Sequence, residues 1–482
     1  MKLRKNNLYA TAALFLAAAF SLAAQNESPS TDHLYHEIFR GQFHFSPRSG
    51  WMNDINGLVY QGGKYHMTYQ WGRDLPGVRH GGYATSPDLV HWTDHGPTLI
   101  PQNSDLPASY ARNVSGEHVF SGSAVVVSGK TARRITGSGK EAIVAIYTGT
   151  GAGTCLAWSN DGGKSWHDFE ANPVANPTRD YNPRDPSVFF HAPTRRWILA
   201  IYENGTTFYG SQDLIHWSFL SNIDFGFECP DLFELPLDGD ESDKKWVLSD
   251  ANGSYLVGDF DGTRFIPSGQ EVLTMACGPD FYAAQTFPTG GLPNGDSRKI
   301  QIAWMDHWNG GLGEKSWERN ATFPVSLQLV TSEGKMRVTR TPIREIALLY
   351  NRSHHWEPQI VLPDNNLFKE IHSKTFELIA EFDLNGSDVG SFGFQVANKK
   401  IAYHVQSQVL LDEALAPTPE GHLKLHILVD WGQLEVFAND GLFSYAEEYA
   451  FSPDNPGDIR LFTDGSLRLI FMTLNELSGI WD

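Results

Sequence analysis

Hydrophobic residues occur in short runs along most of this chain, and polar clusters separate the runs. β-Branched and aromatic residues dominate these runs, for example at residues 124–127, 143–147, 197–202, 246–248 and 300–304. Gly, Asn, Asp and Pro bound each run, and long helical periodicity is hard to find after residue 30. The pattern predicts an all-β protein.

A degenerate repeat lies within the first two thirds of the chain. Residues 86–92 and 211–217 are nearly identical, whereas residues 159–166 and 259–265 are looser copies. In chain order their first residues are 73, 52 and 48 positions apart. Each copy places a polar turn before an aromatic residue, as the outer hairpin of a sheet does. A spacing of about 50 residues suits one four-stranded blade of a β-propeller, and coincidental hairpin chemistry is the alternative.

The pattern changes near residues 341–344. A short helical connector is expected at residues 345–351, and regular alternation of apolar and polar residues begins at about Glu357. The alternation is clear at residues 376–382 and 423–429, and Asn439-Asp440-Gly441 and Asp464-Gly465 mark hairpin turns. About 125 residues of this kind predict a β-sandwich. We therefore expect a five-bladed β-propeller at 36–340, a linker at 341–356 and a C-terminal β-sandwich at 357–482.

Residues 1–24 have the pattern of a signal peptide. Lys2, Arg4 and Lys5 precede an apolar run over about residues 8–22, and small residues follow at 21–24. A membrane anchor is the alternative, but the run is short for a membrane span. The pattern predicts a periplasmic or secreted protein that is free of the membrane after signal cleavage.

Charge and composition narrow the class of ligand. The chain carries a formal charge of −19, and losing Lys2, Arg4 and Lys5 with the signal peptide takes it to −22. Nucleic acid and anionic membranes are therefore poor partners, whereas a neutral ligand is compatible. Aromatic residues make up 12% of the chain and include 14 Trp, which favours a carbohydrate site but is also typical of β-structure.

The chain contains three cysteines, Cys155, Cys229 and Cys277. An odd and sparse count argues against a disulfide scaffold. We expect all three to be buried small hydrophobic residues.

Three widely spaced acidic motifs carry the candidate chemistry. They are Trp51-Met52-Asn53-Asp54-Ile55-Asn56-Gly57, Arg184-Asp185-Pro186 and Glu228-Cys229-Pro230-Asp231. Three carboxylates on segments rich in Pro, Gly and aromatic residues suggest a nucleophile and an acid/base for sugar chemistry. Taken singly, each is better explained as a turn or ladder carboxylate of a β-protein surface, and the ordered set reverses that preference.

Six ordered motifs resemble glycoside hydrolase family 32, the invertase, inulinase and levanase family. Besides the three acidic motifs they are Phe120-Ser121-Gly122-Ser123, Asp280-Phe281-Tyr282-Ala283 and Trp304-Met305-Asp306-His307-Trp308. The resemblance covers most of residues 40–482. It implies a five-bladed propeller followed by a β-sandwich, which agrees with the patterns described above.

The roles of the three carboxylates follow from the chemistry and from the resemblance. A retaining mechanism needs a nucleophilic carboxylate, for which we expect Asp54, and a protonated carboxyl, for which we expect Glu228. The apolar neighbours of Glu228 are expected to desolvate it and so to raise its pKa. Asp185, beside Arg184, is expected to stay ionised and to stabilise the transition state.

The resemblance also implies a set of substrate contacts. The residues at positions that line the terminal fructose pocket in the family are Asn53, Gln70, Phe120, Ser121, Arg184 and Trp304. Asp280 is expected to contact a second sugar unit or Glu228. Without the family, Gln70 is an ordinary polar strand end and Trp304 a core aromatic residue.

Two segments depart from the family pattern. Ile55 replaces the usual Pro, so the loop gains an N–H and loses a fixed φ. Residues 78–84 lack the usual Trp-Gly-His-Ala sequence, and Gly81 stands where the Trp is expected. We expect Gly81 to open space for another sugar unit, and Trp71 or Tyr83 to substitute in part for the missing Trp.

The sequence predicts a retaining β-fructosidase that acts on a fructan (levan or inulin) or on a fructose-ended oligosaccharide. Exo attack is preferred, and endo cleavage, disaccharide release and fructosyl transfer remain alternatives. Other classes to weigh are a non-catalytic fructan-binding protein and a propeller enzyme acting on arabinans or xylans. No metal or organic cofactor is expected, since clustered metal ligands and a phosphate-binding Gly loop are absent from the sequence. Linkage preference and oligomeric state stay open.

Overall fold

The four copies of the repeat occupy equivalent places in the computed structural model, which describes residues 35–74, 77–177, 182–305, 316–449 and 457–481. Each copy joins two neighbouring strands at a sheet edge: β3 (His80–Ser86) and β4 (Thr93–Leu99), β7 (Gly153–Ser159) and β8 (His167–Asp168), β11 (Thr206–Ser211) and β12 (Ser218–Ile223), and β15 (Ser254–Phe260) and β16 (Phe265–Pro267). The expectation that the repeat forms outer hairpins is confirmed.

The two best copies share one hydrogen-bond pattern, built around Asp88 and Asp213. In each, an aspartate oxygen accepts the backbone N–H groups two and three residues on, and the other oxygen contacts the following His ring. The Trp that ends each copy donates its indole N–H to the carbonyl of Leu89 or Leu214, two residues with positive φ. The polar turn and the aromatic residue therefore stabilise one bend together.

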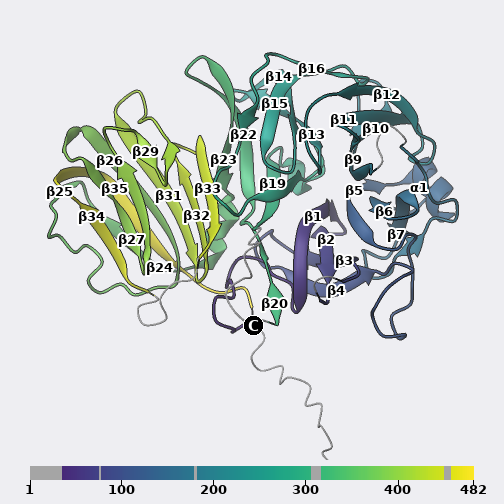
Figure 1. The fold of residues 1–482 in the computed structure, drawn as a ribbon, viewed down its shortest axis with the longest axis horizontal. Helices are drawn as coiled ribbons and strands as arrows, with labels where there is room; N and C mark the ends of the chain where they lie inside the picture. Colours follow the sequence, from purple (N-terminus) through teal and green to yellow (C-terminus); the bar gives the residue numbers. More distant parts are fainter. Residues whose placement is uncertain (1–34, 75–76, 178–181, 306–315, 450–456, 482) are drawn as a thin grey trace, which may run out of the picture. The chain divides into compact units, whose positions relative to one another are not determined.

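Within the described residues, the strands before residue 343 form four sheets (Figure 1). The first contains β1 (Gly50–Gln61), β2 (Lys64–Gly72), β3 (His80–Ser86), β4 (Thr93–Leu99) and β20 (Trp317–Glu318). The second contains β5 (Val119–Val127), β6 (Ala142–Gly149), β7 (Gly153–Ser159) and β8 (His167–Asp168). The third contains β9 (Arg184–His191), β10 (Arg196–Tyr202), β11 (Thr206–Ser211) and β12 (Ser218–Ile223).

The fourth sheet has ten described strands. They are β13 (Asp231–Leu237), β14 (Asp240–Ser249), β15 (Ser254–Phe260), β16 (Phe265–Pro267), β17 (Leu273–Thr274), β18 (Tyr282–Thr286), β19 (Lys299–Met305), β21 (Asn320–Ala321), β22 (Val325–Ser332) and β23 (Lys335–Pro342). Parallel pairing of Leu237 with Leu329 joins two successive runs of strands into this one sheet. The count of five blades therefore stays a prediction, whereas the propeller architecture agrees with the repeat.

The first strands of the successive runs lie side by side. β1 contacts β5, β5 contacts β9, and β18 contacts both β13 and β1. Ser187 of β9 donates a hydrogen bond to Asp231 of β13. These inner strands begin at one end of the propeller, and the same end receives the residues singled out by the acidic motifs.

Helices are few in the described part of the chain. They are α1 (Gly129–Thr136) and the short 3₁₀ helices η2 (Pro293–Gly295) and η3 (Arg344–Leu349). The expected connector corresponds to η3. The sequence pattern did not predict α1, which is a single eight-residue helix between β5 and β6.

Two further sheets make up the C-terminal part. One contains β24 (Tyr350–Trp356), β25 (Gln359–Val361), β26 (Thr375–Asp388), β31 (His422–Asp430), β32 (Gln433–Ala438), β33 (Phe443–Glu448) and β35 (Ser466–Leu477). The other contains β27 (Ser391–Val396), β28 (Lys399–His404), β29 (Val409–Leu410), β30 (Glu413–Ala414) and β34 (Ile459–Thr463).

The predicted alternation places one face of each C-terminal sheet in a shared core. Phe376, Leu378 and Phe382 of β26 are buried in one cluster with Phe392 and Phe394 of β27. This is the packing of a β-sandwich, as predicted. Because β24 pairs with β35, the sandwich sheet begins inside the segment assigned to the linker.

No helix in the described ranges is long and apolar enough to cross a membrane. The predicted signal peptide, residues 1–24, lies outside these ranges.

Candidate active site

The inner strands bring the three acidic motifs to one place. Asp54 lies in β1 where the pairing with β2 shifts register between Met52 and Ile55. Asp185 is the second residue of β9, and Glu228 comes three residues before β13. A register shift turns a side chain away from the regular alternation, which explains how Asp54 leaves the strand face.

Four side chains contact the Asp54 carboxylate. The Trp304 indole N–H donates to Oδ1 at 3.0 Å, and the Gln70 amide donates to Oδ2 at 3.2 Å. The Ser121 hydroxyl donates to Oδ2, and Gln70 also donates to Ser121 at 2.6 Å. The Cys229 thiol lies 3.6 Å from the same oxygen. The structure thus brings the predicted residues Gln70, Ser121 and Trp304 directly to Asp54.

Burial is the main influence on Asp54. It raises the pKa of this carboxyl, and the nearby negative charge of Glu228 raises it further. The hydrogen bond from Ser121 acts in the opposite direction, because it stabilises the ionised form. Nearby donors thus hold the buried and poorly hydrated Asp54 carboxyl group in a fixed orientation.

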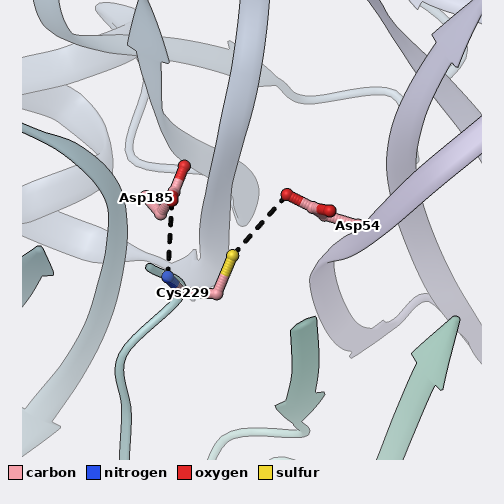
Figure 2. Close-up of side chains that lie close together, drawn as sticks. All are labelled: Asp54, Asp185 and Cys229. Atoms are coloured by element: carbon pink, nitrogen blue, oxygen red, sulfur yellow. Dashed lines mark hydrogen bonds between the residues drawn. The ribbon is translucent and has the colours of Figure 1, made fainter. Parts of the chain in front are cut away.

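Cys229 lies between Asp54 and Asp185 (Figure 2). Its thiol points to Asp54, and its backbone N–H donates to Asp185 Oδ2 at 3.3 Å. Cys229 is buried and free, as predicted, but it contacts the candidate nucleophile and does more than fill space.

Unusual backbone conformations occur at this site. Asp185, Glu228 and Cys229 all have positive φ, a region that costs energy for residues with a side chain. Thr148 accepts the Asp185 N–H at 2.9 Å and so holds the start of β9 in place. Such strain concentrates where the fold fixes side chains for function.

Arg184 pairs more closely with Glu228 than with Asp185, and the ionised state expected for Asp185 stays a prediction. Arg184 Nε lies 3.8 Å from Asp185 Oδ2, but the guanidinium gives two hydrogen bonds to Glu228 Oε1, at 3.0 and 2.8 Å. Burial, together with the charges of Asp54 and Glu228, raises the pKa of Asp185 to about 8, and the charge of Arg184 acts in the opposite direction. Burial therefore works against the expected ionised state of Asp185.

Glu228 has polar as well as apolar neighbours, which differs from the apolar surroundings that the sequence predicts. Arg184 binds one carboxylate oxygen, and the Tyr282 hydroxyl donates to the other at 2.5 Å. Phe227, one of the expected apolar neighbours, is exposed. The Glu228 side chain is 26% exposed, which leaves it open to an incoming leaving group.

Two arginines near the site were not identified from the sequence. Arg319 is buried, donates to the Asn53 side chain and lies over the Trp304 ring. Arg79 lies over the Trp51 and Phe120 rings, and the negative charge of Asp54 acts on it. Arg319 lies outside every quoted motif, and Arg79 lies in the departing segment 78–84 without a role assigned to it, so only the fold reveals their places at the site.

Asp280 contacts the sandwich. Its Oδ2 accepts the backbone N–H of Glu448 in β33 at 2.6 Å, and its N–H donates to Ala446. Burial raises the pKa of Asp280 to about 7. Asp280 comes two residues before Tyr282, so this contact fixes the segment that presents Tyr282 to Glu228. A direct substrate contact by Asp280 stays a prediction.

The expectation that Gly81 opens space is wrong. A Cβ placed on Gly81 would lie 2.7 Å from Leu99 Cβ and Cδ1, so the Leu99 side chain already fills this position. Tyr83 is no substitute for the missing Trp, because its hydroxyl donates to the Gly162 carbonyl in a loop of the second sheet. Trp71 is buried in the core and donates to the Ser49 carbonyl.

The Gly81→Ala variant should be less stable by about 1–3 kcal/mol, because the added methyl group overpacks against Leu99. Thermal unfolding of both proteins measures the difference. Gly269→Ala is the matched control, since a Cβ there meets nothing within 4 Å. Equal stability of Gly81→Ala and the parent would show that the site has room.

Replacing Asp54 by Asn should lower the pKa of Asp185. The charge of Asp54 is the second-largest cause that raises this pKa, after burial, and Asn carries no charge. Infrared titration of the carboxyl band in ¹³C-aspartate-labelled protein measures it. An Asp185 band that titrates near pH 8 in both proteins would contradict the coupling.

A metal ion does not suit this cluster. Potential ligand atoms of Asp54, Asp185 and Cys229 all lie within 4.8 Å of one another. Cysteine binds metals as the thiolate, but burial and the two neighbouring carboxylates raise the pKa of Cys229 well above its usual value. A metal ion would have to displace the proton of this thiol before it could bind here.

Comparisons with known proteins agree with this fold. The model of the glycosyl hydrolases family 32 N-terminal domain matches residues 44–341, and that of the family 32 C-terminal region matches residues 345–476. A levanase of Bacillus subtilis is 31% identical over 521 residues, which cover 97% of this chain and 74% of the levanase. An extracellular exo-inulinase of Aspergillus niger is 29% identical, covering 93% of this chain and 96% of the relative.

The chain spans less of some relatives. It covers 53% of a levanase from Bacillus sp. strain L7, at 29% identity. Among solved structures, the exo-inulinase of Aspergillus awamori superposes with a TM-score of 0.80 at 26% identity, covering 93% of this chain and all of that one. A Schwanniomyces occidentalis β-fructofuranosidase structure, complexed with fructosyl-erythritol, shares the fold with a TM-score of 0.77 at 22% identity.

Proposed function

Because the chain belongs to glycosyl hydrolase family 32, we propose that it is a retaining β-fructosidase that cleaves β-fructofuranosidic bonds in fructans or fructose-ended oligosaccharides. The observation that carries this proposal is the buried Asp54 carboxylate. Three donors hold it, and Cys229, the neighbour of Glu228, contacts it. A fixed carboxylate nucleophile with a second carboxyl nearby is the arrangement that retaining glycosidases use.

In the first step, an Asp54 oxygen bonds to the anomeric carbon of the fructosyl unit while the bond to the leaving-group oxygen breaks. Glu228 gives its proton to that oxygen and becomes a carboxylate. In the second step, Glu228 takes a proton from water, and the water oxygen replaces Asp54 at the anomeric carbon. Fructose leaves, and both carboxyl groups return to their initial states.

We assign Asp185 the role of transition-state stabiliser. Its carboxylate accepts hydrogen bonds from sugar hydroxyls. Burial and the charges of Asp54 and Glu228 raise its pKa, and bond formation neutralises the Asp54 charge and so removes one cause of that rise. Ionised Asp185 is thereby favoured while positive charge develops on the sugar.

We favour exo action on levan or inulin and a location outside the cytoplasm. The first proposal is supported by relatives named levanase and exo-inulinase. The chain covers 96% of the exo-inulinase of Aspergillus niger. The Aspergillus niger relative is an extracellular exo-inulinase, and this, together with the signal-peptide pattern at residues 1–24, supports the second. We place the catalytic site in the propeller, residues 36–340, and assign residues 350–482, which include β24, to the sandwich.

A time course of the purified protein on levan, inulin and sucrose tests this function. Products are separated by chromatography from the earliest times. Fructose as the first and sole product supports exo-fructosidase action, and the preferred polymer gives the linkage. Early oligosaccharides would indicate endo cleavage, a difructose product disaccharide release, and longer products fructosyl transfer. No turnover of any fructoside, with hydrolysis of arabinan instead, would overturn the proposal.

A further inference from the structure

A cavity separate from the cluster around Asp54 is lined by the inner strands β1, β5, β9, β13 and β18. It has a volume of about 530 Å³, which lies in the range of small-ligand pockets. Its lining includes Tyr60 near the end of β1, His191 at the end of β9 and Thr286 at the end of β18. Tyr60 lies six residues beyond Asp54, roughly 20 Å along an extended strand. None of the residues that contact Asp54 lines this cavity.

The cavity contains three buried polar side chains with complementary hydrogen-bonding capacity. Asp231 accepts the Thr286 N–H at 2.9 Å, and its carboxylate keeps capacity for further donors. Lys299 donates to the Phe287 carbonyl at 2.9 Å and to Thr289 at 2.8 Å, which leaves one of its three hydrogens. Among the described residues, no ion pair joins Lys299 to Asp231, although both line the same cavity.

Gln285 provides an independent sign of a missing ligand. It is 3% exposed, it lines the cavity, and its amide nitrogen has no hydrogen-bond partner in the described structure. Buried donors are almost always satisfied in folded proteins, by protein, water or ligand. A polar group that enters the cavity supplies the missing acceptor.

The chemistry of the lining selects hydroxyl groups. A hydroxyl both accepts and donates, so one hydroxyl accepts from Gln285 or Lys299 and donates to Asp231. A carboxylate or phosphate would meet Asp231 and Glu234 in the same cavity, on a chain of net charge −19. A neutral polyol therefore fits better than an anion.

Aromatic rings form part of the lining of this cavity. Phe190 is 49% exposed and packs edge-on against Trp197, with ring centroids 5.0 Å apart. Phe189 and Trp246 form a second pair in the same lining. An exposed ring beside buried hydrogen-bonding groups is the combination that binds a sugar, which has one apolar C–H face and hydroxyls at its rim.

We propose that this cavity is a second, non-catalytic binding site for a neutral oligosaccharide, namely a segment of the fructan chain. The identity of the sugar rests on the proposed function. A polymer held at this site stays close to the enzyme between cleavages, so the site raises the efficiency on long chains and leaves short substrates unaffected.

Calorimetric titration of the Asp54→Asn protein with inulin and levan oligosaccharides of four fructose units tests this site. The expected result is two sites per chain. In the same background, Phe190→Ala should weaken one of them by about fivefold to tenfold, the range for loss of one aromatic contact. Phe190→Trp keeps a ring and should retain both sites. Phe219→Ala is the matched control, because Phe219 is 47% exposed on β12 and does not line the cavity.

The outcomes separate this inference from the function. One site that none of these variants changes would overturn the second site and leave the fructosidase proposal intact. Absence of any binding by Asp54→Asn would overturn both. With Asp54 restored, Phe190→Ala should lower kcat/KM on polymer and leave sucrose turnover unchanged. An equal loss on both substrates would indicate a folding defect and count against the site.

Discussion

The Asp54→Asn protein should lose fructoside hydrolysis by about four orders of magnitude or more, while it still folds and binds sugar. Removing a nucleophile on which a covalent intermediate depends produces losses of this size. Asn has nearly the same shape as Asp, so the packing of the site changes little. It lacks the charge that forms the bond to the anomeric carbon.

The hydrogen-bond network explains why the loss should be so complete. Ser121 and Gln70 both donate to Asp54 Oδ2, and Trp304 donates to Oδ1. An amide accepts through one oxygen only, so either Trp304 or the Ser121–Gln70 pair faces an NH₂ group that cannot accept. Both the chemistry and the orientation of the side chain are therefore lost.

Initial rates on sucrose and levan, with thermal unfolding as the folding check, measure this effect. Asp259→Asn is the matched control, because the Asp259 side chain is 65% exposed and lies on β15, outside the site. It should keep full activity. Residual activity of Asp54→Asn within a hundredfold of the parent would show that another residue is the nucleophile.

The second large effect is expected at His44, which ties the N-terminal segment to the sandwich. His44 Nδ1 lies 2.9 Å from Asp430 Oδ2, and Nε2 lies 2.9 Å from Glu435 Oε1. All three side chains are buried. His44→Phe should lower the free energy of unfolding by about 3–5 kcal/mol, since it leaves two buried carboxylates without their cation.

The same contact should make stability depend on pH. The two carboxylates raise the pKa of His44 to about 9 against the opposing effect of burial, from 6.5 in an exposed His. A group whose pKa is higher in the folded state stabilises it fully below about pH 6.5, and the contribution is lost as pH rises through about 9. The raised pKa corresponds to about 3 kcal/mol.

Urea unfolding at pH 6, 7.5 and 9.5 tests both statements. The difference in stability between the parent and His44→Phe should be largest at pH 6 and smallest at pH 9.5. His355→Phe is the control, because His355 is exposed on β24 and should show no such trend. A difference that stays constant across this range would exclude a protonated His44.

The sequence by itself determined the local structure and the identity of the candidate chemistry. The hairpins at residues 86–92 and 211–217 form because Asp, His and Trp contacts stay within a few residues. Alternation at residues 376–382 predicted the buried face of β26. The turn at Asn439-Asp440-Gly441 has positive φ at all three residues, as its composition indicates. Short-range contacts of this kind can be read from residue order.

Only the tertiary structure decided which partner each charged group takes. Arg184 is adjacent to Asp185 in sequence, yet it binds Glu228, 44 residues away. Asp280 contacts Glu448 across 168 residues, and His44 contacts Asp430 across 386. The raised pKa of Asp185 and the filling of space at Gly81 depend likewise on what packs there. Burial and long-range pairing set these properties, and residue order does not contain them, because they arise only when distant strands meet.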